Sequence, residues 1–400
     1  MTTNPTASIP PPAAPARSLG LALAPLCGVV FLEFLAMGLP LPVLPLRVHG
    51  ALGYGSFVVG LVIGAQSWAT LLTRHTAGTW SDRGGPRGAT VTGLALSALA
   101  GATYALSAAV SAPALSLAVL LLGRALLGLG ESLVITGALS WGVALAGRER
   151  SGVVMSWVGV AMYAALAAGA PLGVTLDARL GFSGVSWAAA MAPAAALAVL
   201  PLARAVRPAG GARMPFYRVL GRIWLPGLGL TLTALGFGAI AGFSTLRFAE
   251  RGWSHASLAM TSFGAAYALA RVFFGSLPDT LGGARVAMGS AAVAALGQAA
   301  MWLAPSGAVA VCAAALSGFG FSLAFPSFGV TALRRVPPEN RGAALGAYTA
   351  CFDLAMGLGV PLLGAVVSAA GYGGAFALSA LASLASWAIA LALSRQEVNA

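Results

Sequence analysis

The sequence predicts an all-α membrane protein with twelve transmembrane helices arranged as two pseudo-symmetric six-helix bundles. Three observations lead to this prediction: the composition, the number of apolar segments and an internal repeat. Of the 400 residues, 58% are hydrophobic and only 8% are charged, and the mean hydropathy is +0.88. A soluble protein carries about 25% charged residues. This chain is therefore too apolar to cover a water-facing surface, and we expect lipid to surround it.

Apolar segments bounded by arginine, glycine and proline clusters define the expected helices. A spanning helix needs about 20 apolar residues. The expected helices cover residues 20–46, 54–75, 88–109, 113–145, 151–176, 184–204, 222–246, 256–277, 285–304, 308–332, 342–368 and 374–394. Pro40, Pro42 and Pro45 are expected to end or kink the first helix, because proline lacks a backbone amide. That segment is longer than a signal-peptide core and contains Glu33, so we interpret it as a retained helix.

The placement of arginine predicts the orientation. All 22 basic residues are arginine. With a cytoplasmic N-terminus, sixteen of them, Arg74 included, lie on the cytoplasmic face. Only four lie on the opposite face, namely Arg47, Arg179, Arg247 and Arg251. Cytoplasmic loops carry such an excess. We therefore predict a multi-pass protein of the cell inner (cytoplasmic) membrane with both termini cytoplasmic, and we attribute the net charge of +12 to topology rather than to nucleic-acid binding.

The chain divides around a polar stretch near its middle. Residues 204–222 contain five arginines together with proline and glycine, which is typical of a linker. The predicted segments are a disordered cytoplasmic N-terminus (1–18), an N-terminal six-helix bundle (19–204), a cytoplasmic linker (205–221), a C-terminal six-helix bundle (222–394) and a cytoplasmic tail (395–400).

An internal repeat supports the division into halves. Asp82 and Asp279 close similar glycine-initiated motifs, Gly78-Thr79-Trp80-Ser81-Asp82 and Gly275-Ser276-Leu277-Pro278-Asp279, which lie 197 residues apart. A second offset of 190 relates three further sets, namely Gly128 and Gly130 to Gly318 and Gly320, Gly152 to Gly342, and Gly169-Ala170-Pro171 to Gly359-Val360-Pro361. Several matches at one offset indicate two homologous halves.

Three motifs carry a resemblance to a known family. They are Gly78-x-x-x-Asp82-Arg83-x-Gly85-x-Arg87 after the second helix, Arg124-x-x-x-Gly128-x-Gly130 in the fourth, and Gly169-Ala170-Pro171-Leu172-Gly173 in the fifth. With these motifs the chain after residue 18 resembles the major facilitator superfamily, and more particularly its bacterial drug and sugar efflux, proton-antiporter branch. The third motif departs from the antiporter pattern, because Ala170 interrupts its Gly-Pro pair and the final Gly-Gly is incomplete.

The resemblance implies a secondary transporter with the major facilitator fold. Such a protein would export a small drug-like or sugar-like solute by alternating access in exchange for protons. It would work as a monomer in the bilayer, without a cofactor. A proton-coupled uptake symporter or a uniporter of the same superfamily is the alternative. A membrane enzyme, a channel or an ATP-driven pump is disfavoured, because the sequence has neither a catalytic constellation nor a phosphate-binding loop.

The resemblance also implies a gating role for the loop after the second helix, with Gly78, Asp82, Arg83, Gly85 and Arg87 as its residues. Asp82 would contact the N-terminus of the eleventh helix near Gly342. A carboxylate is stabilised there by unpaired amides and by the helix dipole. The contact would break when the halves move.

Charges inside the predicted helices are the other candidates, because a charge in hydrocarbon is costly and is most often functional. Glu33 and Asp353 are the best candidates for a proton site. Glu131 follows them, and Arg124, two helical turns away on the same face, is the candidate modulating cation. The alternative for each is a structural ion pair. Arg271 is expected to extend to the cytoplasmic surface.

Weaker candidates complete the set. Gly169, Pro171 and Gly173 suit a helix that bends or seals a pathway. Four aromatic residues would line a substrate cavity or serve only in packing, namely Tyr163, Tyr267, Tyr348 and Phe352. The three histidines and three cysteines have no ligand spacing, so no metal site is predicted. We interpret the cysteines as small buried hydrophobic residues. Carboxylates at mid-depth are compatible with cationic drugs as well as with neutral sugars, so the sequence leaves the solute open.

Overall fold

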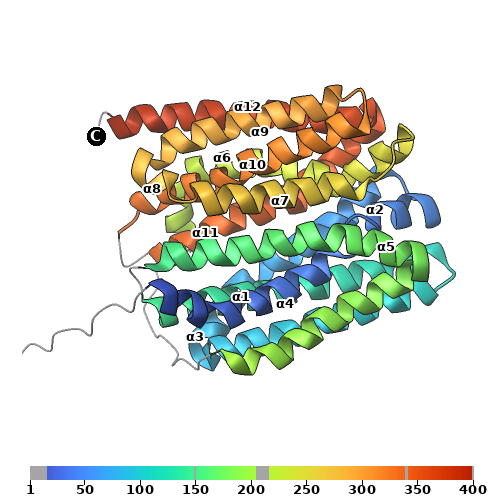
Figure 1. Cartoon of the computed structure of the whole chain (residues 1–400), viewed down its shortest axis with the longest axis horizontal. Helices are drawn as coiled ribbons and strands as arrows, with labels where there is room; N and C mark the ends of the chain where they lie inside the picture. The colour runs from blue at the N-terminus through green and yellow to red at the C-terminus, as the bar shows by residue number, and fades with distance from the viewer. Residues whose placement is uncertain (1–15, 148–149, 204–215, 338–340, 399–400) are drawn as a thin grey trace, which may run out of the picture.

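The fold is a bundle of long, nearly parallel helices (Figure 1). The structure is a computed structural model, which describes residues 16–147, 150–203, 216–337 and 341–398. The first half contains α1 (Ala16–Gly38), α2 (Leu44–Leu46), a π-helix (Arg47–Ala51), α3 (Ser56–Ala109), α4 (Pro113–Ala146), α5 (Ser151–Val199) and a 3₁₀ turn (Leu200–Leu202). The second half contains α6 (Phe216–Glu250), α7 (Ser257–Phe274), α8 (Leu277–Leu281), α9 (Gly283–Leu303), α10 (Gly307–Arg334), α11 (Arg341–Leu354), a π-helix (Ala355–Gly359) and α12 (Val360–Val398). Over these residues the predicted all-α fold is confirmed.

Three of the helices turn back at a glycine. α3 and α5 contain 54 and 49 residues, and at 1.5 Å per residue each would be roughly twice as long as the bilayer is thick. The backbone leaves helical geometry at Gly85 in α3, Gly181 in α5 and Gly371 in α12, where φ is 83°, 65° and 71°. Glycine adopts positive φ without a steric penalty. Ten stretches of the described helices are long and apolar enough to span a membrane, and two of them, Val153–Leu202 and Ala344–Glu397, turn back at Gly181 and Gly371. Counting the arms of these two separately gives the twelve predicted helices.

Two predicted boundaries differ from the structure. The first long helix ends at Gly38 rather than at residue 46, because Pro40 and Pro42 supply no amide to continue its hydrogen bonds. After a turn the chain resumes as α2. In the middle of the chain, α6 begins at Phe216, inside the predicted linker. The remainder of that linker, like the predicted N-terminal segment up to residue 15, falls outside the described residues.

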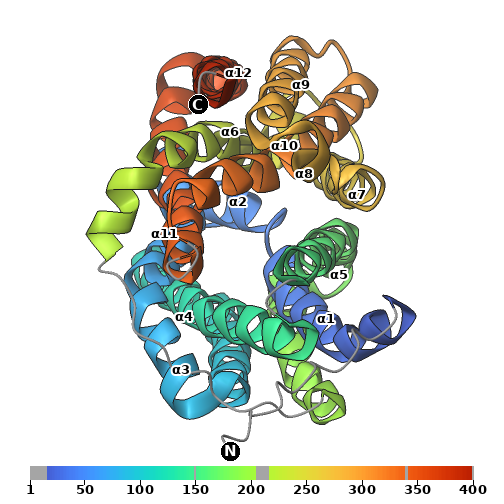
Figure 2. The same ribbon diagram turned by 90° about the vertical axis from the view of Figure 1, so that its left-hand side faces the viewer.

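The two halves meet along two seams. Seen along the helices, α1, α3, α4 and α5 lie on one side and the elements from Phe216 on the other, whereas the short α2 reaches over to α6 (Figure 2). In the first seam, α3 packs against α11 and α12. In the second seam, α5 packs against α7. The start of α1 and the end of α12 lie at the same end of the molecule (Figure 1), which we call the termini end.

The repeat predicted from glycine spacing is visible in the packing. A methyl group placed on Gly130 would lie 2.7 Å from the carbonyl oxygen of Gly93, and one placed on Gly320 would lie 2.8 Å from that of Ser290. Gly93 and Ser290 are 197 residues apart, and Gly130 and Gly320 are 190 apart. Corresponding helices therefore approach one another at corresponding residues. Small residues allow such close approach in membrane bundles, and the two halves are pseudo-symmetric, as predicted.

Candidate functional site

An ion pair joins the two halves at the first seam. The Nε and Nη2 atoms of Arg74 on α3 donate to Oδ2 of Asp353 on α11, at 2.8 and 2.5 Å. Only 16% of the Arg74 side chain and 3% of the Asp353 side chain are exposed. Arg74 was expected to be one of the topological arginines, and its partnership with Asp353 was not predicted. The π-helix Ala355–Gly359 directly follows Asp353, and such local distortions are frequent at functional sites.

Glu131 lies on α4 beside this ion pair. Its Oε2 atom accepts hydrogen bonds from Nε2 of Gln66 at 2.6 Å and from Oγ1 of Thr70 at 3.4 Å. Its carboxylate also interacts electrostatically with Asp353 and Arg74. Since Thr70 precedes Arg74 by one helical turn, the polar face of α3 connects Glu131 to the seam.

Glu33 lies on α1, inside the first half. Its carboxylate is buried, and Oε1 accepts a hydrogen bond from Oγ of Ser97 at 2.5 Å. Among the described residues, Oε2 has no hydrogen-bond partner. An unpaired buried carboxylate oxygen is costly, so this group is suited to binding a proton. Glu33 also interacts electrostatically with Glu131.

Arg124 was expected to modulate Glu131 on the same face of α4, but its hydrogen bonds are made elsewhere. Its Nε and Nη2 atoms donate to the carbonyl oxygens of Val62 and Ile63 on α3, both at 3.0 Å. The side chain is 1% exposed. An electrostatic interaction with Glu131 remains, but the hydrogen bonds of Nε and Nη2 go to the backbone of α3. The arginine therefore acts first as a brace between α4 and α3.

The second seam contains Arg271, Tyr267 and Tyr163. The rings of Tyr163 on α5 and Tyr267 on α7 stack with centroids 3.5 Å apart. Nη2 of Arg271 donates to Oη of Tyr267 at 2.6 Å. The expectation that Arg271 extends to the cytoplasmic surface is wrong, because its side chain is 6% exposed and its guanidinium group lies about 4 Å from the position of a methyl group on Gly159 of α5.

An aromatic cluster surrounds the tyrosine pair. Tyr163 contacts the rings of Phe237, Phe263 and Phe321 at centroid distances of 5.9–6.4 Å, and Phe352 stacks on Phe237 and Phe321 at 6.1 Å. Three of the four aromatic candidates thus come together between the halves. The three other phenylalanines were missed because phenylalanine in an apolar segment is indistinguishable from ordinary packing.

Tyr348, the fourth aromatic candidate, packs within its own half. Its Oη atom donates to the carbonyl oxygen of Phe325 at 2.6 Å, and its ring meets that of Phe325 edge to face, with centroids 5.4 Å apart. Its side chain thus braces α11 against α10.

The gating motif is described only in part. Gly85 has a positive φ and Gly78 is buried, whereas Arg87 is exposed. The structure does not describe the side chains of Asp82 and Arg83, nor those at the start of α11 near Gly342. The predicted contact between Asp82 and this helix end therefore stays a prediction.

The antiporter-like motif lies within the first half rather than at a seam. A methyl group placed on Gly169 would lie 2.7 Å from the carbonyl carbon of Gly38, and one placed on Gly173 would overlap the carbonyl oxygen of Leu39. Pro171 is half-buried between them. These residues let α5 approach the end of α1, at the point where the chain leaves the first helix.

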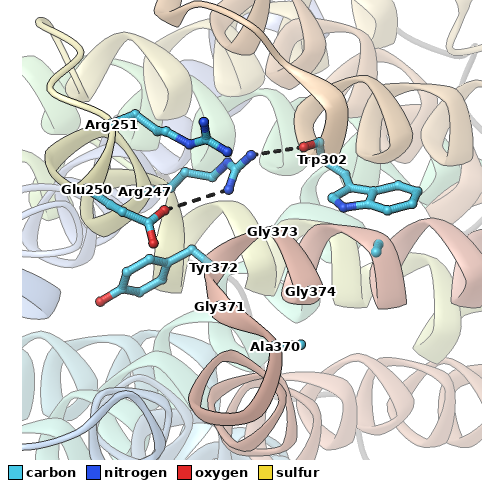
Figure 3. Close-up of a pocket in the computed structure, with 10 residues that line it drawn as sticks. Arg247, Glu250, Arg251, Trp302, Ala370, Gly371, Tyr372, Gly373 and Gly374 are labelled. Atoms are coloured by element: carbon cyan, nitrogen blue, oxygen red, sulfur yellow. Dashed lines mark hydrogen bonds and ion pairs between the residues drawn. The ribbon is translucent and has the colours of Figure 1, made fainter.

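A pocket of about 660 Å³ lies at the end opposite the termini end, within the second half (Figure 3). Arg247 lines it, donates to the carbonyl oxygen of Trp302 at 2.9 Å and pairs with Glu250 at 3.8 Å. In the first half, Arg47 donates to the carbonyl oxygen of Ser107 at 3.5 Å. Arg247 connects the end of α6 to the end of α9, and Arg47, in the π-helix that follows α1 and α2, makes a similar connection to the end of α3. We therefore interpret Arg247 as a structural brace.

No three histidine, cysteine, aspartate or glutamate side chains lie together as metal ligands within the described ranges. Cys27 and Cys351 are half-buried, but Cys312 is exposed. The expectation that all three cysteines are buried is therefore wrong for Cys312.

Comparisons with known proteins agree with this architecture. The family model of the Major Facilitator Superfamily matches residues 26–249 and 227–399. An uncharacterized MFS-type transporter of Salmonella typhimurium is 42% identical over 386 residues, which cover 96% of this chain and all of the relative. An uncharacterized MFS-type transporter of Pseudomonas aeruginosa is 44% identical over 382 residues, which cover 92% of this chain and 91% of the relative.

Two solved structures share the fold at low sequence identity. The human organic anion transporter MFSD10 has a TM-score of 0.72 at 17% identity, over 94% of this chain and 100% of that one. A point mutant of the nucleoside transporter NupG has a TM-score of 0.74 at 16% identity, over 93% and 99%. The relatives and fold neighbours are transporters rather than enzymes. By its sequence and its fold, the chain belongs to the major facilitator superfamily of multi-pass membrane transporters.

Proposed function

We propose that the chain exports a small organic solute, drug-like or sugar-like, by alternating access and in exchange for protons. The observation that carries this proposal is the buried ion pair between Arg74 and Asp353, which connects the two halves. Any rocking of the halves that opens the first seam at this depth must break the pair. Breaking a buried ion pair is costly when the charges are left uncompensated. A proton on Asp353 removes one of those charges.

Coupling to protons follows because Arg74 and a proton compete for the carboxylate of Asp353. With Asp353 charged, Arg74 holds the halves together, and with Asp353 protonated the seam is free to open. Glu131 on α4 and Glu33 on α1 supply two further proton-binding groups inside the first half. Acidic side chains within membrane helices commonly form such relays. Arg124 influences Glu131 through its charge while it braces α4.

Further parts of the proposal rest on sequence patterns. We infer that the termini end is cytoplasmic in the cell inner membrane, because the arginine excess falls on the loops at that end. Residues 205–221 would then connect two independently packed halves on the cytoplasmic side. The loop from Gly78 to Arg87 would gate that side, and Gly169, Pro171 and Gly173 would set the position of α5 against α1. A monomer would contain every part of this machinery.

The test uses the purified protein in liposomes that enclose a pH-sensitive dye. Ethidium and arabinose serve as probes of the drug-like and sugar-like classes. An outward solute gradient should drive protons in the opposite direction across the membrane. Asp353→Asn and Glu33→Gln should remove this coupling, because the substituted amides bind no proton at neutral pH. Glu250→Gln is the matched control, since its carboxylate is 44% exposed outside both seams.

Three results would contradict the proposal. Movement of solute and protons in the same direction would favour the symporter alternative. Solute movement without any proton flux would indicate a uniporter. Full coupling in both the Asp353 and the Glu33 variants would remove these carboxylates from the mechanism.

A further inference from the structure

Arg74 and Arg271 occupy equivalent positions in the two halves. They are 197 residues apart, and this offset also relates Gly93 to Ser290, which make the corresponding helix contacts. The partner of Arg74 is Asp353. At the offset of 190 that relates α11 to α5, the equivalent of Asp353 is Tyr163. The second seam therefore keeps the arginine of the first seam but has a neutral phenol in place of its carboxylate.

Arg271 has too few partners for a buried cation. Its Nη2 atom donates a hydrogen bond to Oη of Tyr267 at 2.6 Å, and its guanidinium carbon lies 5.3 Å from the centroid of the same ring. Its Nε atom is buried without a hydrogen-bond partner, and no ion pair joins it to a carboxylate of the described residues. A buried charge is normally paired or bound to an ion. The site is therefore complementary to an anion.

A glycine of the opposite half lies against the guanidinium group of Arg271. Gly159 of α5 faces it without a side chain, and a methyl group placed there would lie 3.9 Å from Nη2 of Arg271 and 3.9 Å from Oη of Tyr267. On the other side stands the aromatic cluster, which begins with the stacked rings of Tyr163 and Tyr267. A charged end and an apolar, aromatic wall thus lie next to each other at the second seam.

We propose that Arg271 binds the anionic group of the transported solute, and that this solute is an organic acid with an aromatic or apolar body. The proposal rests on the transport function proposed above and adds the chemical class of the solute. A carboxylate suits the arginine because the guanidinium group presents parallel N–H donors to both carboxylate oxygens. The two seams would then bind different species: the first would bind the proton at Asp353, and the second would bind the solute at Arg271.

The experiment measures binding to the purified full chain in detergent, by the shift of its thermal unfolding midpoint. Benzoate, 1-naphthoate and indole-3-acetate are compared with their amides at constant ionic strength. At least one acid should bind about tenfold or more tightly than its amide, as expected for a charge-assisted hydrogen-bonded pair. Arg271→Gln should reduce that acid to the affinity of its amide. Arg251→Gln, which removes an exposed arginine, should bind as the wild type does.

A second variant separates binding from folding. Gly159→Ala places a methyl group in ordinary contact with the guanidinium and is compatible with the helix. It should fold, keep Arg271 and still lose affinity for the acid, because the methyl group occupies the space next to Nη2. Arg271→Lys should keep part of the affinity, since it retains the charge but not the paired donors.

Other results would overturn the proposal. It fails if no acid stabilises the wild type more than its amide does. It fails equally if Arg271→Gln, or Gly159→Ala where the glutamine variant does not fold, keeps the preference for acid. Binding of acids without proton-coupled movement would reject the transport mechanism and leave Arg271 as an anion site. Proton-coupled transport of arabinose or ethidium without acid binding would support the transport mechanism and reject Arg271 as an anion site.

Discussion

At the scale of single residues, the Arg74–Asp353 pair is the contact most sensitive to change. Both side chains are largely withdrawn from water, and both donor atoms of the arginine that face the carboxylate are engaged. Removing one partner leaves the other charge buried and uncompensated. Replacing both side chains by neutral amides leaves no uncompensated charge, which a protein interior tolerates far better.

We therefore expect Arg74→Gln to destabilise the protein by about 3 kcal/mol and the double variant Arg74→Gln, Asp353→Asn to recover most of that loss. The measurement is a double-mutant cycle on the thermal unfolding midpoint in detergent. A coupling free energy near zero would mean that the pair contributes nothing to stability. Arg87→Gln is the control, because that arginine is exposed just after the turn of α3 at Gly85.

From the sequence, the acids could be singled out but their partners could not, and the role of the acids as proton sites stays a prediction. Glu33, Glu131 and Asp353 were identified because a carboxylate inside an apolar segment is conspicuous. Arg74 was not, because an arginine at the end of an apolar segment normally serves topology. Arg271 was misplaced for the same reason. Whether a long basic side chain reaches water or turns inward depends on the neighbouring helix, which one segment alone does not specify.

At the scale of helices, glycine determines how closely neighbours pack. A methyl group on Gly128 of α4 would collide with the carbonyl oxygen of Gln66 on α3, and one on Gly318 of α10 with that of Phe263 on α7. These are equivalent contacts in the two halves. Both involve backbone atoms, which move only if a whole helix shifts.

Gly128→Ala should accordingly destabilise the protein by about 1–3 kcal/mol, the usual cost of overpacking, and Gly318→Ala should behave alike. Gly289→Ala is the matched control, since a methyl group there meets no atom within 4 Å and alanine is the better helix former. The measurement is the thermal unfolding midpoint of each of the three variants, compared with that of the wild type. Equal midpoints for Gly128→Ala and Gly289→Ala would show that α4 is free to move away from α3.

Helix positions were predicted well, and their ends less well. The first helix ends at Gly38, ahead of the prolines that were expected to lie within or beyond it. Apolar character continues through residues 39–46 and disguised the end. The turns at Gly85, Gly181 and Gly371 fall close to predicted boundaries, because only glycine adopts their backbone geometry at low cost.

At the scale of the whole molecule, alternating access requires that the two seams open and close in turn. The part of the first seam farthest from the termini end is tightly closed. A methyl group on Gly60 of α3 would lie 2.7 Å from the Cα atom of Pro361 on α12, and one on Gly364 would collide with the carbonyl oxygen of Ser56.

A large side chain at Gly60 should act as a wedge that prevents this closure. We expect Gly60→Trp to lower the rate of solute exchange in liposomes about tenfold or more while the protein stays folded. Gly55→Trp, at the N-cap of the same helix, is the control, because a Cβ atom there meets no atom within 4 Å. Unchanged exchange in the Gly60 variant would show that closure of this contact is not part of the transport cycle.

The sequence by itself determined the solvent of this protein, the number of its helices, its repeat and its superfamily. The first three follow from composition, from the length of apolar segments and from spacings along the chain, all of which are local or periodic properties, and the superfamily follows from the resemblance of three motifs. The tertiary structure decided which charges meet: that Arg74 pairs with Asp353, that Arg124 binds backbone carbonyls, and that Arg271 has no carboxylate partner in the part of the chain that the structure describes. Partners in this bundle lie as many as 279 residues apart, and only the packing of one half against the other selects among them.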